Sequence, residues 1–436
     1  MDGGVNIMNE KNPEELYKER MERVMTTIGL KEPDRVPITP MSMFYAPTQK
    51  GYTKKEAMYE PQKLAQASFE VFSKTNWDMV PPLLGVFPAG VFDGLGVQFF
   101  KWPGAADEKQ RLGDDVHFQY VEGEYMKADE YDEFFLDPTG FVIRKIIPRH
   151  HKNLQGFSMF PNLISLVSGY GVILNIPLFF GTPPNQEMMK SIGQAAVKLF
   201  EYVGANNKYV EDMKNIGYPV GFSNFVQAPY DVVSEFLRGM KGGMLDMYRR
   251  PEKLKKLLEM LVPSSIQATL IAQQMAPDNP IVFIPLHRGA DGFMSREQFE
   301  EFYFPSLAAI MEALIQNNLI PCPFWEGSYN ERLDFLGEFA QKHKGKMIYW
   351  FDRTDIIHAK EVFGDYVTIR GNVPASMLAT GTPQQIDEYV KKIIEGCAEG
   401  GGFIVDGGVS GIPDEAKPEC VKAMTEAVFK YGEYRK

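Results

Sequence analysis

Residues 320–327 read IPCPFWEG, an apolar run that ends in a carboxylate, Glu326, followed at once by Gly327. Seven other short apolar runs have strand character, and amphipathic helical patterns separate most of them. The eight runs are VPIT (36–39), DMVPPLL (78–84), VGFSNF (220–225), IVFIPL (281–286), IPCPFW (320–325), MIYWF (347–351), YVTIRG (366–371) and GFIVD (402–406). Apolar strands that alternate with helices are typical of a parallel sheet covered on both faces. Eight such units predict an α/β fold, a closed (β/α)8 TIM barrel.

The intervals between the runs predict helices and one long insertion. The helical ranges are 54–74, 187–206, 251–274, 296–316, 330–343, 354–363 and 383–397. The interval 94–218 follows the second strand and contains hairpin-like pieces, VQFFKWPG, HFQYVEGEY and FVIRKIIPR. We expect it to lie over the barrel mouth as an insertion. Residues 1–436 are therefore predicted to form a single barrel domain, with an N-terminal helical extension at 1–33.

Composition excludes several classes of protein. The net charge is −11, and acidic and basic residues are mixed along the chain, so no Lys/Arg stripe is available to bind nucleic acid. Three cysteines, Cys322, Cys397 and Cys420, are too few and too scattered for a disulfide framework or a metal site built from cysteine alone. The N-terminus is polar and lacks the apolar region of a signal peptide. We expect a protein of the reducing cytoplasm.

The segment 160–180, FPNLISLVSGYGVILNIPLFF, is apolar over roughly the length of a membrane span. Pro161, Asn162, Asn175 and Pro177 interrupt it, and no dense basic flank anchors it. We therefore interpret it as a buried or lid-like segment of a protein that does not enter the membrane. It is also a candidate contributor to a docking surface at the barrel rim.

Polar side chains recur just past the apolar runs, where a (β/α)8 barrel places its chemistry. They are Ser42, Tyr45, Asn224, Gln227, His287, Arg288, Asp291, Glu326, Tyr329, Asn330, Asp352, Arg353, Arg370, Asn372 and Asp406. Six of them are predicted to bind substrate: Tyr45, Asn224, Arg288, Tyr329, Arg353 and Asn372.

Glu326, His287 and Asp352 are the predicted catalytic residues, because an unpaired carboxylate at the end of a buried strand is unfavourable without a function. Such a set can supply a general acid beside an orienting carboxylate. His287, Glu326 and Asp406 can instead supply nitrogen and oxygen ligands for zinc. Structural roles compete with these, since a strand-end histidine often bonds a backbone carbonyl and Asp352–Arg353 can be an internal salt bridge.

Two further features have structural interpretations. Cys322 lies on the same strand as Glu326 but deeper, where a small buried apolar residue is expected. The glycine-rich turns 400–402 and 407–408 surround Asp406, but no P-loop pattern of Lys and Ser/Thr follows them. A phosphate-binding loop is therefore the weaker interpretation of these turns.

Four motifs resemble the uroporphyrinogen decarboxylase superfamily, which includes the corrinoid-dependent methyltransferases. They are DRVPITP (34–40), ADGFMSREQFEEFYFPSL (290–307), GNVPASMLATGTPQQIDEYVKKIIE (371–395) and GGGFIVDGG (400–408). The resemblance covers most of the predicted barrel and leaves out the insertion 94–218.

Departures from the family patterns narrow the branch. The decarboxylase branch carries an arginine motif after the first strand, and here that place reads PMSMFY (40–45) without arginine. Thiol methyltransferases carry His-x-Cys after the fifth strand and a Cys after the eighth. Here Phe324-Trp325-Glu326 takes the first place, and Val409 and Ser410 lie in the second. A cysteine-rich zinc site is therefore not expected.

The resemblance implies an O-demethylase methyltransferase. Its substrate would be a methoxylated, aromatic small molecule, and the methyl group would pass to the cob(I)alamin of a separate corrinoid protein. Zinc as a Lewis acid and a homodimer are left open. Two alternatives remain: a decarboxylase or lyase that holds an acid with Arg288, Arg353 and Arg370, and a non-catalytic barrel that binds a corrinoid or tetrapyrrole.

Overall fold

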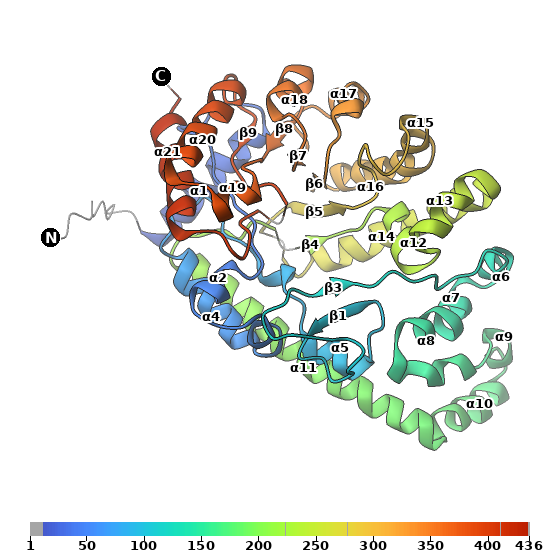
Figure 1. The fold of residues 1–436 in the computed structure, drawn as a ribbon. Coiled ribbons are helices and arrows are strands. Elements are labelled where there is room, and N and C mark those ends of the chain that lie inside the picture. The colour runs from blue at the N-terminus through green and yellow to red at the C-terminus, as the bar shows by residue number, and fades with distance from the viewer. Residues whose placement is uncertain (1–11, 223, 277, 410, 435–436) are drawn as a thin grey trace.

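The computed structural model describes residues 12–222, 224–276, 278–409 and 411–434. Its central sheet has six parallel strands in the order of the chain, β4-β5-β6-β7-β8-β9 (Figure 1). Their bounds are β4 (Asn224–Phe225), β5 (Ile281–Leu286), β6 (Ile320–Trp325), β7 (Ile348–Phe351), β8 (Thr368–Arg370) and β9 (Phe403–Ile404). Parallel neighbours in chain order are the arrangement that right-handed βαβ units produce. The predicted strands at 281–286 and 320–325 are confirmed residue for residue.

Segments 36–42 and 78–80 join the two edges of this sheet. The backbone N–H of Thr39 donates to Val405, and the N–H of Asp78 donates to Ile38. Val80 forms a parallel bridge with Val220, just before β4. Eight strand positions therefore follow one another around a ring, and the predicted (β/α)8 architecture is confirmed.

The first two predicted strands are isolated bridges in this ring, not regular strands. Proline is the physical reason: Pro37, Pro40, Pro81 and Pro82 lack the N–H that a continuous ladder requires. Apolar runs rich in proline can thus occupy a strand position while making few of its hydrogen bonds.

Helices cover the outside of the ring (Figure 1). They include α12 (Pro229–Phe236), α13 (Gly239–Arg249), α14 (Pro251–Gln273), α16 (Phe304–Gln316), α17 (Leu333–Lys342), α18 (Ile356–Phe363), α20 (Pro383–Cys397) and α21 (Pro418–Tyr431). The range predicted for α20 is confirmed at both ends, because Thr382 and Gln385 form a capping box and Pro383 occupies the first turn. The predicted helix 54–74 is instead divided into α3 (Lys54–Tyr59) and α4 (Pro61–Phe72), since Pro61 starts a new helix.

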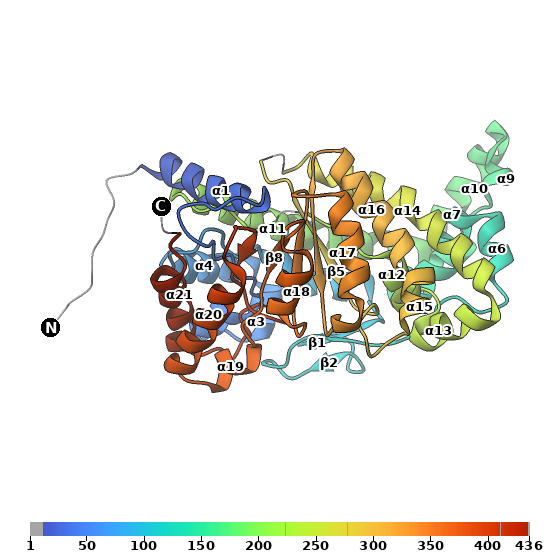
Figure 2. The ribbon, with the colours of Figure 1, turned by 90° about the horizontal axis from the view of Figure 1, so that it is seen from above.

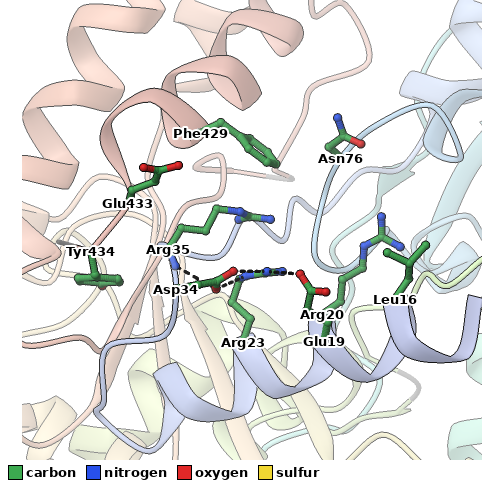
Figure 3. A pocket seen from close by; sticks show the side chains of 10 residues that line it. All are labelled: Leu16, Glu19, Arg20, Arg23, Asp34, Arg35, Asn76, Phe429, Glu433 and Tyr434. Atoms are coloured by element: carbon green, nitrogen blue, oxygen red, sulfur yellow. Dashed lines mark hydrogen bonds and ion pairs between the residues drawn. The ribbon is translucent and has the colours of Figure 1, made fainter. Parts of the chain in front are cut away.

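Helix α1 (Pro13–Ile28) lies across the amino-terminal ends of the strands (Figure 2). Its Arg23 donates to buried Asp78 at 2.6 Å, and Arg35 donates to the same carboxylate at 2.8 Å. Figure 3 shows the pocket of about 360 Å³ beside this cluster, where Arg20, Arg23 and Asp34 lie close together. The pocket is at the opposite end of the barrel from the carboxyl ends of the strands.

The insertion begins with a small sheet. Strand β1 (Phe100–Pro103) pairs in parallel with β2 (Arg111–Leu112) and antiparallel with β3 (Gln119–Tyr120). The third predicted hairpin piece, 141–149, is wrong, because this stretch is helical from α7 (Pro138–Phe141) through α8 (Ile147–His150). Asp137 accepts a hydrogen bond from the N–H of Gly140 and pairs with Arg144, so the helical turn is capped at its start.

The apolar segment 160–180 forms α9 (Leu163–Leu166) and α10 (Gly169–Gly181), which lead into the 33-residue helix α11 (Pro183–Asn215). The prediction that this segment is buried is wrong, since Ile164 and Tyr170 are each 81% exposed. Figure 2 shows α9 and α10 projecting away from the side on which β1 and β2 lie, so they do not reach the barrel mouth. Within the described residues no helix is both long enough and apolar enough to cross a membrane.

Candidate active site at the carboxyl ends of the strands

Two carboxylates on α12 lie beneath the site. Asp231 and Glu235 are four residues apart, so they share one face of the helix, and both are buried. Asp231 accepts hydrogen bonds from the backbone N–H groups of His287 (2.9 Å) and Arg288 (3.1 Å) and from the hydroxyl of Tyr303 (2.8 Å). Burial raises the pKa of Asp231 to about 6, although the charge of His287 opposes this.

His287 follows β5 and binds the second carboxylate. Its Nδ1 lies 2.5 Å from Oε1 of Glu235. Burial lowers the pKa of His287, but the hydrogen bond to Glu235 and the charge of Asp231 outweigh burial and raise it to about 9. His287 is therefore an imidazolium at neutral pH, with Nδ1–H donating to Glu235. A third of its side chain is exposed, which leaves Nε2–H accessible to a ligand.

Glu326 lies beside His287 because β5 and β6 are parallel neighbours. Leu286 pairs with Trp325, so the residues that follow them, His287 and Glu326, leave the sheet together. Gly327 has φ 88°, a left-handed conformation that lets the chain turn at this point. Burial raises the pKa of Glu326, and the charge of Asp352 adds to this, while the charge of His287 opposes it. Glu326 thus keeps its proton to a higher pH than an ordinary glutamate.

Asp352, after β7, connects three of the loops around the mouth. Its two oxygens accept hydrogen bonds from the N–H groups of Gly327 (3.1 Å) and Val409 (3.0 Å). Burial raises its pKa, although these hydrogen bonds lower it. The expected pair with Arg353 is present at 3.5 Å, but the Arg353 side chain is 77% exposed. Asp352 therefore acts on Glu326 through charge and through the position of Gly327.

The predicted zinc ligands do not come together. Asp406 is fully buried in an ion pair with Arg370 at 2.8 Å, and it also accepts from the N–H groups of Met41 and Gly407. His287 uses Nδ1 for Glu235. Across residues 12–434, apart from the undescribed positions 223, 277 and 410, no three His, Cys, Asp or Glu side chains are arranged to hold a metal ion. His287, Glu326 and Asp406 therefore do not fit a zinc site. Ser410, named above for its place after the eighth strand, lies outside the described residues.

Two predicted substrate-binding residues face the wrong way. The amide of Asn224 donates to the carbonyl of Thr269 on α14, outside the ring, because successive side chains of a strand alternate in direction. Tyr45 begins α2 (Tyr45–Gln49) and is buried in the core, where burial raises its pKa to about 12. Strand-end position alone did not show which face each residue would take.

The other predicted binding residues lie at or behind the site. Arg288 is next to Glu326, whose pKa its charge lowers, and it packs over Phe293. Tyr329 is fully buried behind the site, with its ring 4.9 Å from that of Trp325. Asn372 donates to the carbonyls of Asp352 (3.0 Å) and Thr354 (2.9 Å), so it holds the loop after β7.

Sequence reasoning missed Asp231, Glu235 and Tyr303. A signal for the first two was present, since the stretch PYDVVSEF (229–236) places two acids on the apolar side of an amphipathic helix. Tyr303 ends a π-helical turn (Phe299–Tyr303), which changes the direction of its side chain relative to a regular helix. The chain pattern contains no signal for that turn.

The insertion covers part of the mouth. The hydroxyl of Tyr120, on β3, donates to the backbone carbonyl of Glu235 at 2.6 Å. At the first strand, the ring of Phe44 lies 4.9 Å from the ring of His117. Residues 117–120 therefore extend from the first strand to α12, and Figure 2 shows the sheet of β1 and β2 next to the carboxyl ends of the strands.

A (β/α)8 barrel with an acid–imidazolium cluster at the strand ends defines the class of this protein, and comparison with known proteins defines its family. The model of the uroporphyrinogen decarboxylase (URO-D) family matches residues 182–431, more than half of the chain. The chain belongs to this family.

Similar proteins support that assignment. Uroporphyrinogen decarboxylase from Pseudoalteromonas atlantica is 25% identical over 227 residues, which cover 50% of this chain and 61% of the relative. The enzyme of that name from Pectobacterium carotovorum is 23% identical over 278 residues, 62% of this chain and 71% of the relative. The match thus spans about three-fifths of the length of the first relative. A methyltransferase from Methanosarcina mazei shares the fold, with a TM-score of 0.61 at 14% identity over 94% of this chain and 98% of that one.

Proposed function

We propose that this protein is a methyltransferase that moves a methyl group from a methoxylated, aromatic compound to the cob(I)alamin of a separate corrinoid protein. The observation that carries the proposal is the pair Glu326 and His287, two side chains with raised pKa values that follow the paired ends of β6 and β5. Cleavage of a CH3–O bond leaves a phenolate or alkoxide, a poor leaving group unless it is protonated. The fold shared with a methyltransferase supports the same reaction class.

In this proposal Glu326 gives its proton to the ether oxygen as the methyl group departs. The corrinoid, on its own carrier, supplies the nucleophile for the methyl carbon. Burial raises the pKa of Glu326, the charge of Asp352 adds to this shift, and Asp352 also holds the turn at Gly327. Glu235 keeps His287 protonated, so that Nε2–H can stabilise the oxygen during proton transfer. This chain needs only an accessible mouth for the carrier, and the one-third exposure of His287 fits that need.

The decarboxylase alternative finds less support in the site. It would require Arg288, Arg353 and Arg370 to hold a carboxylate together. Arg370 is already paired with Asp406, and Arg353 is largely exposed. Of the three guanidinium groups, Arg288 is the one placed beside Glu326.

The test is a coupled assay with the purified protein, a reduced corrinoid carrier protein and a panel of methoxylated aromatic acids. We expect phenol formation and the absorbance change of corrinoid methylation, both dependent on the chain and on the carrier. Carbon dioxide is measured in parallel. Carbon dioxide release without phenol formation would support the decarboxylase alternative instead.

A further inference from the structure

Residues 153–186 contain no Asp, Glu, Lys, Arg or His, although 24% of the whole chain is Asp, Glu, Lys or Arg. A run of 34 residues at that rate would hold about eight charges. The inner side of this segment packs in a small core, where Phe179 contacts Phe157 and Phe160. Its outer side is apolar and open, since Val167 and Tyr170 are about four-fifths exposed. An uncharged surface of this kind is unusual for a free protein face.

Helix α11 continues the apolar surface with a regular stripe. The stripe is formed by Met189, Gly193, Ala196, Phe200, Val203, Asn207 and Val210. The steps between these residues alternate between four and three, which is the a/d spacing of a helix pair. Phe200 is 73% exposed, while Tyr202 and Tyr209 on the opposite side are buried against the molecule. Figure 1 shows the part of α11 next to α10 along the lower border of the molecule.

The exposed area is large enough for a stable interface. Nine apolar side chains between Met159 and Phe200 are at least two-thirds exposed, and each offers roughly 100 Å². Together they present on the order of 900 Å², whereas the largest apolar patch of a typical monomer is about 300–600 Å². A standard interface needs about 800 Å² from each partner. One face of this molecule therefore meets that requirement.

We propose that the outer side of α9, α10 and α11, hereafter the α10–α11 surface, binds a second copy of this chain. Residues 153–186 carry no charge, and exposed lysines of α11 pair with acids of the same helix (Lys190–Glu187, Lys198–Glu201 and Lys208–Asp212). The surface can therefore meet its own copy with little like-charge repulsion, even though the whole chain carries −11. The heptad stripe on α11 then packs against the same stripe of the copy, related by a two-fold axis. The small residues Gly193 and Ala196 allow the two helices to approach closely.

Two other occupants fit less well. A membrane surface is bound by amphipathic helices that carry Lys and Arg beside their apolar face. Residues 153–186 carry none, and Lys190 and Lys198 of α11 are each paired with a glutamate of the same helix. A corrinoid carrier must reach Glu326 at the barrel mouth, whereas α9 and α10 project away from that side (Figure 2). Dimerisation through the α10–α11 surface leaves the barrel mouth free in both copies. The proposed dimer therefore does not depend on the reaction proposed above.

The test is sedimentation velocity of the full chain at micromolar concentration. We expect twice the 49.4 kDa mass of one chain. The variant Leu174→Glu/Phe200→Glu places charges on the exposed surface, twice by symmetry, and should raise the dimer Kd on the order of a hundredfold or more. Tyr248→Glu is the matched control, because Tyr248 is 76% exposed on α13. Circular dichroism checks that each variant is folded.

A cross-link tests the two-fold geometry. Phe200 is at the middle of the stripe, so in an antiparallel pair it faces its own counterpart. The three native cysteines are buried, so a cysteine placed at Phe200→Cys is the exposed thiol. Oxidation should link Phe200→Cys into a covalent dimer and leave Tyr248→Cys as a single chain. A wild-type monomer, a dimer unchanged in Leu174→Glu/Phe200→Glu, or vesicle binding by a monomer that this variant abolishes would each overturn the proposal.

Discussion

A buried aspartate lies at each end of the barrel, and the two aspartates have different binding partners. At the amino end, Asp78 is buried and its oxygens face two guanidinium groups, those of Arg23 and Arg35. At the carboxyl end, Asp231 is equally buried but accepts from two backbone N–H groups and a tyrosine hydroxyl. The first arrangement neutralises the charge in place. The second leaves a negative charge that acts on its neighbours.

The consequence appears in the groups around each aspartate. Beside Asp231, burial opposes the protonated form of His287, but the hydrogen bond to Glu235 and the charge of Asp231 raise the pKa of His287. Beside Asp78, the charged groups bind one another and the neighbouring backbone, as Figure 3 shows for Arg23 and Asp34. The pocket of about 360 Å³ thus lies next to ion pairs, while the candidate site lies at the opposite end. A buried acid therefore does not by itself identify a functional site. The groups that bind the acid, guanidinium or neutral, distinguish the two ends.

The largest expected effect is on catalysis at the carboxyl end. Glu326→Gln keeps the shape of the side chain and removes its proton, so methyl transfer should fall about 10²–10⁴-fold. The melting temperature should change little, because the Glu326 side chain makes no ion pair with the described residues. Glu331→Gln, an exposed neighbour, is the control. Turnover near that of the wild type in folded Glu326→Gln would remove the catalytic role.

The next effect is on stability at the amino end. Asp78→Asn leaves Arg23 and Arg35 without their shared carboxylate in a buried place, and should cost about 3–5 kcal/mol of unfolding free energy. Urea unfolding measures this loss, and Asp34→Asn, whose side chain is 59% exposed, should lose less. Methyl transfer by the folded protein should stay near the wild-type rate. A large loss of turnover at unchanged stability would contradict the comparison between the two ends.

A smaller effect is expected on the pKa of His287. Glu235→Gln removes the hydrogen-bonded negative charge, so the pKa of His287 should fall from about 9 towards the ordinary value of about 6.5. A pH titration of the histidine ring signals by NMR measures the shift. Glu388→Gln on α20 is an exposed control. A His287 pKa that stays near 9 in Glu235→Gln would assign the shift to another charge.

The smallest effect is the pH dependence of stability. The pKa of His287 is raised in the folded state, so its contribution is complete below about pH 6.5 and is lost as pH rises through about 9. Because a third of the side chain is exposed, solvent screening limits the effect to on the order of 1–2 kcal/mol. Thermal melts at pH 6 and pH 9.5 should show this loss in the wild type. The loss should be smaller in His287→Gln.

Prediction from sequence succeeded where one local pattern controls the outcome. The runs at 281–286 and 320–325 became strands, and 383–397 became a helix, since apolar continuity and a capping box act over a few residues. It failed at 141–149, which is helical, and at 160–180, which is exposed. At 141–149, Asp137 caps a helix that the apolar pattern did not indicate. At 160–180, the segment projects outward, and its apolar composition does not show that.

The sequence by itself determined the barrel and the position of Glu326 and His287 at its carboxyl end, because parallel strands in chain order place their last residues on one rim. Only the tertiary structure decided what surrounds them. It turned Asn224 towards α14, paired Asp406 with Arg370, and brought Asp231 and Glu235 to His287. Side-chain direction and charge partners depend on which elements pack together, and those contacts join residues up to hundreds of positions apart in the chain.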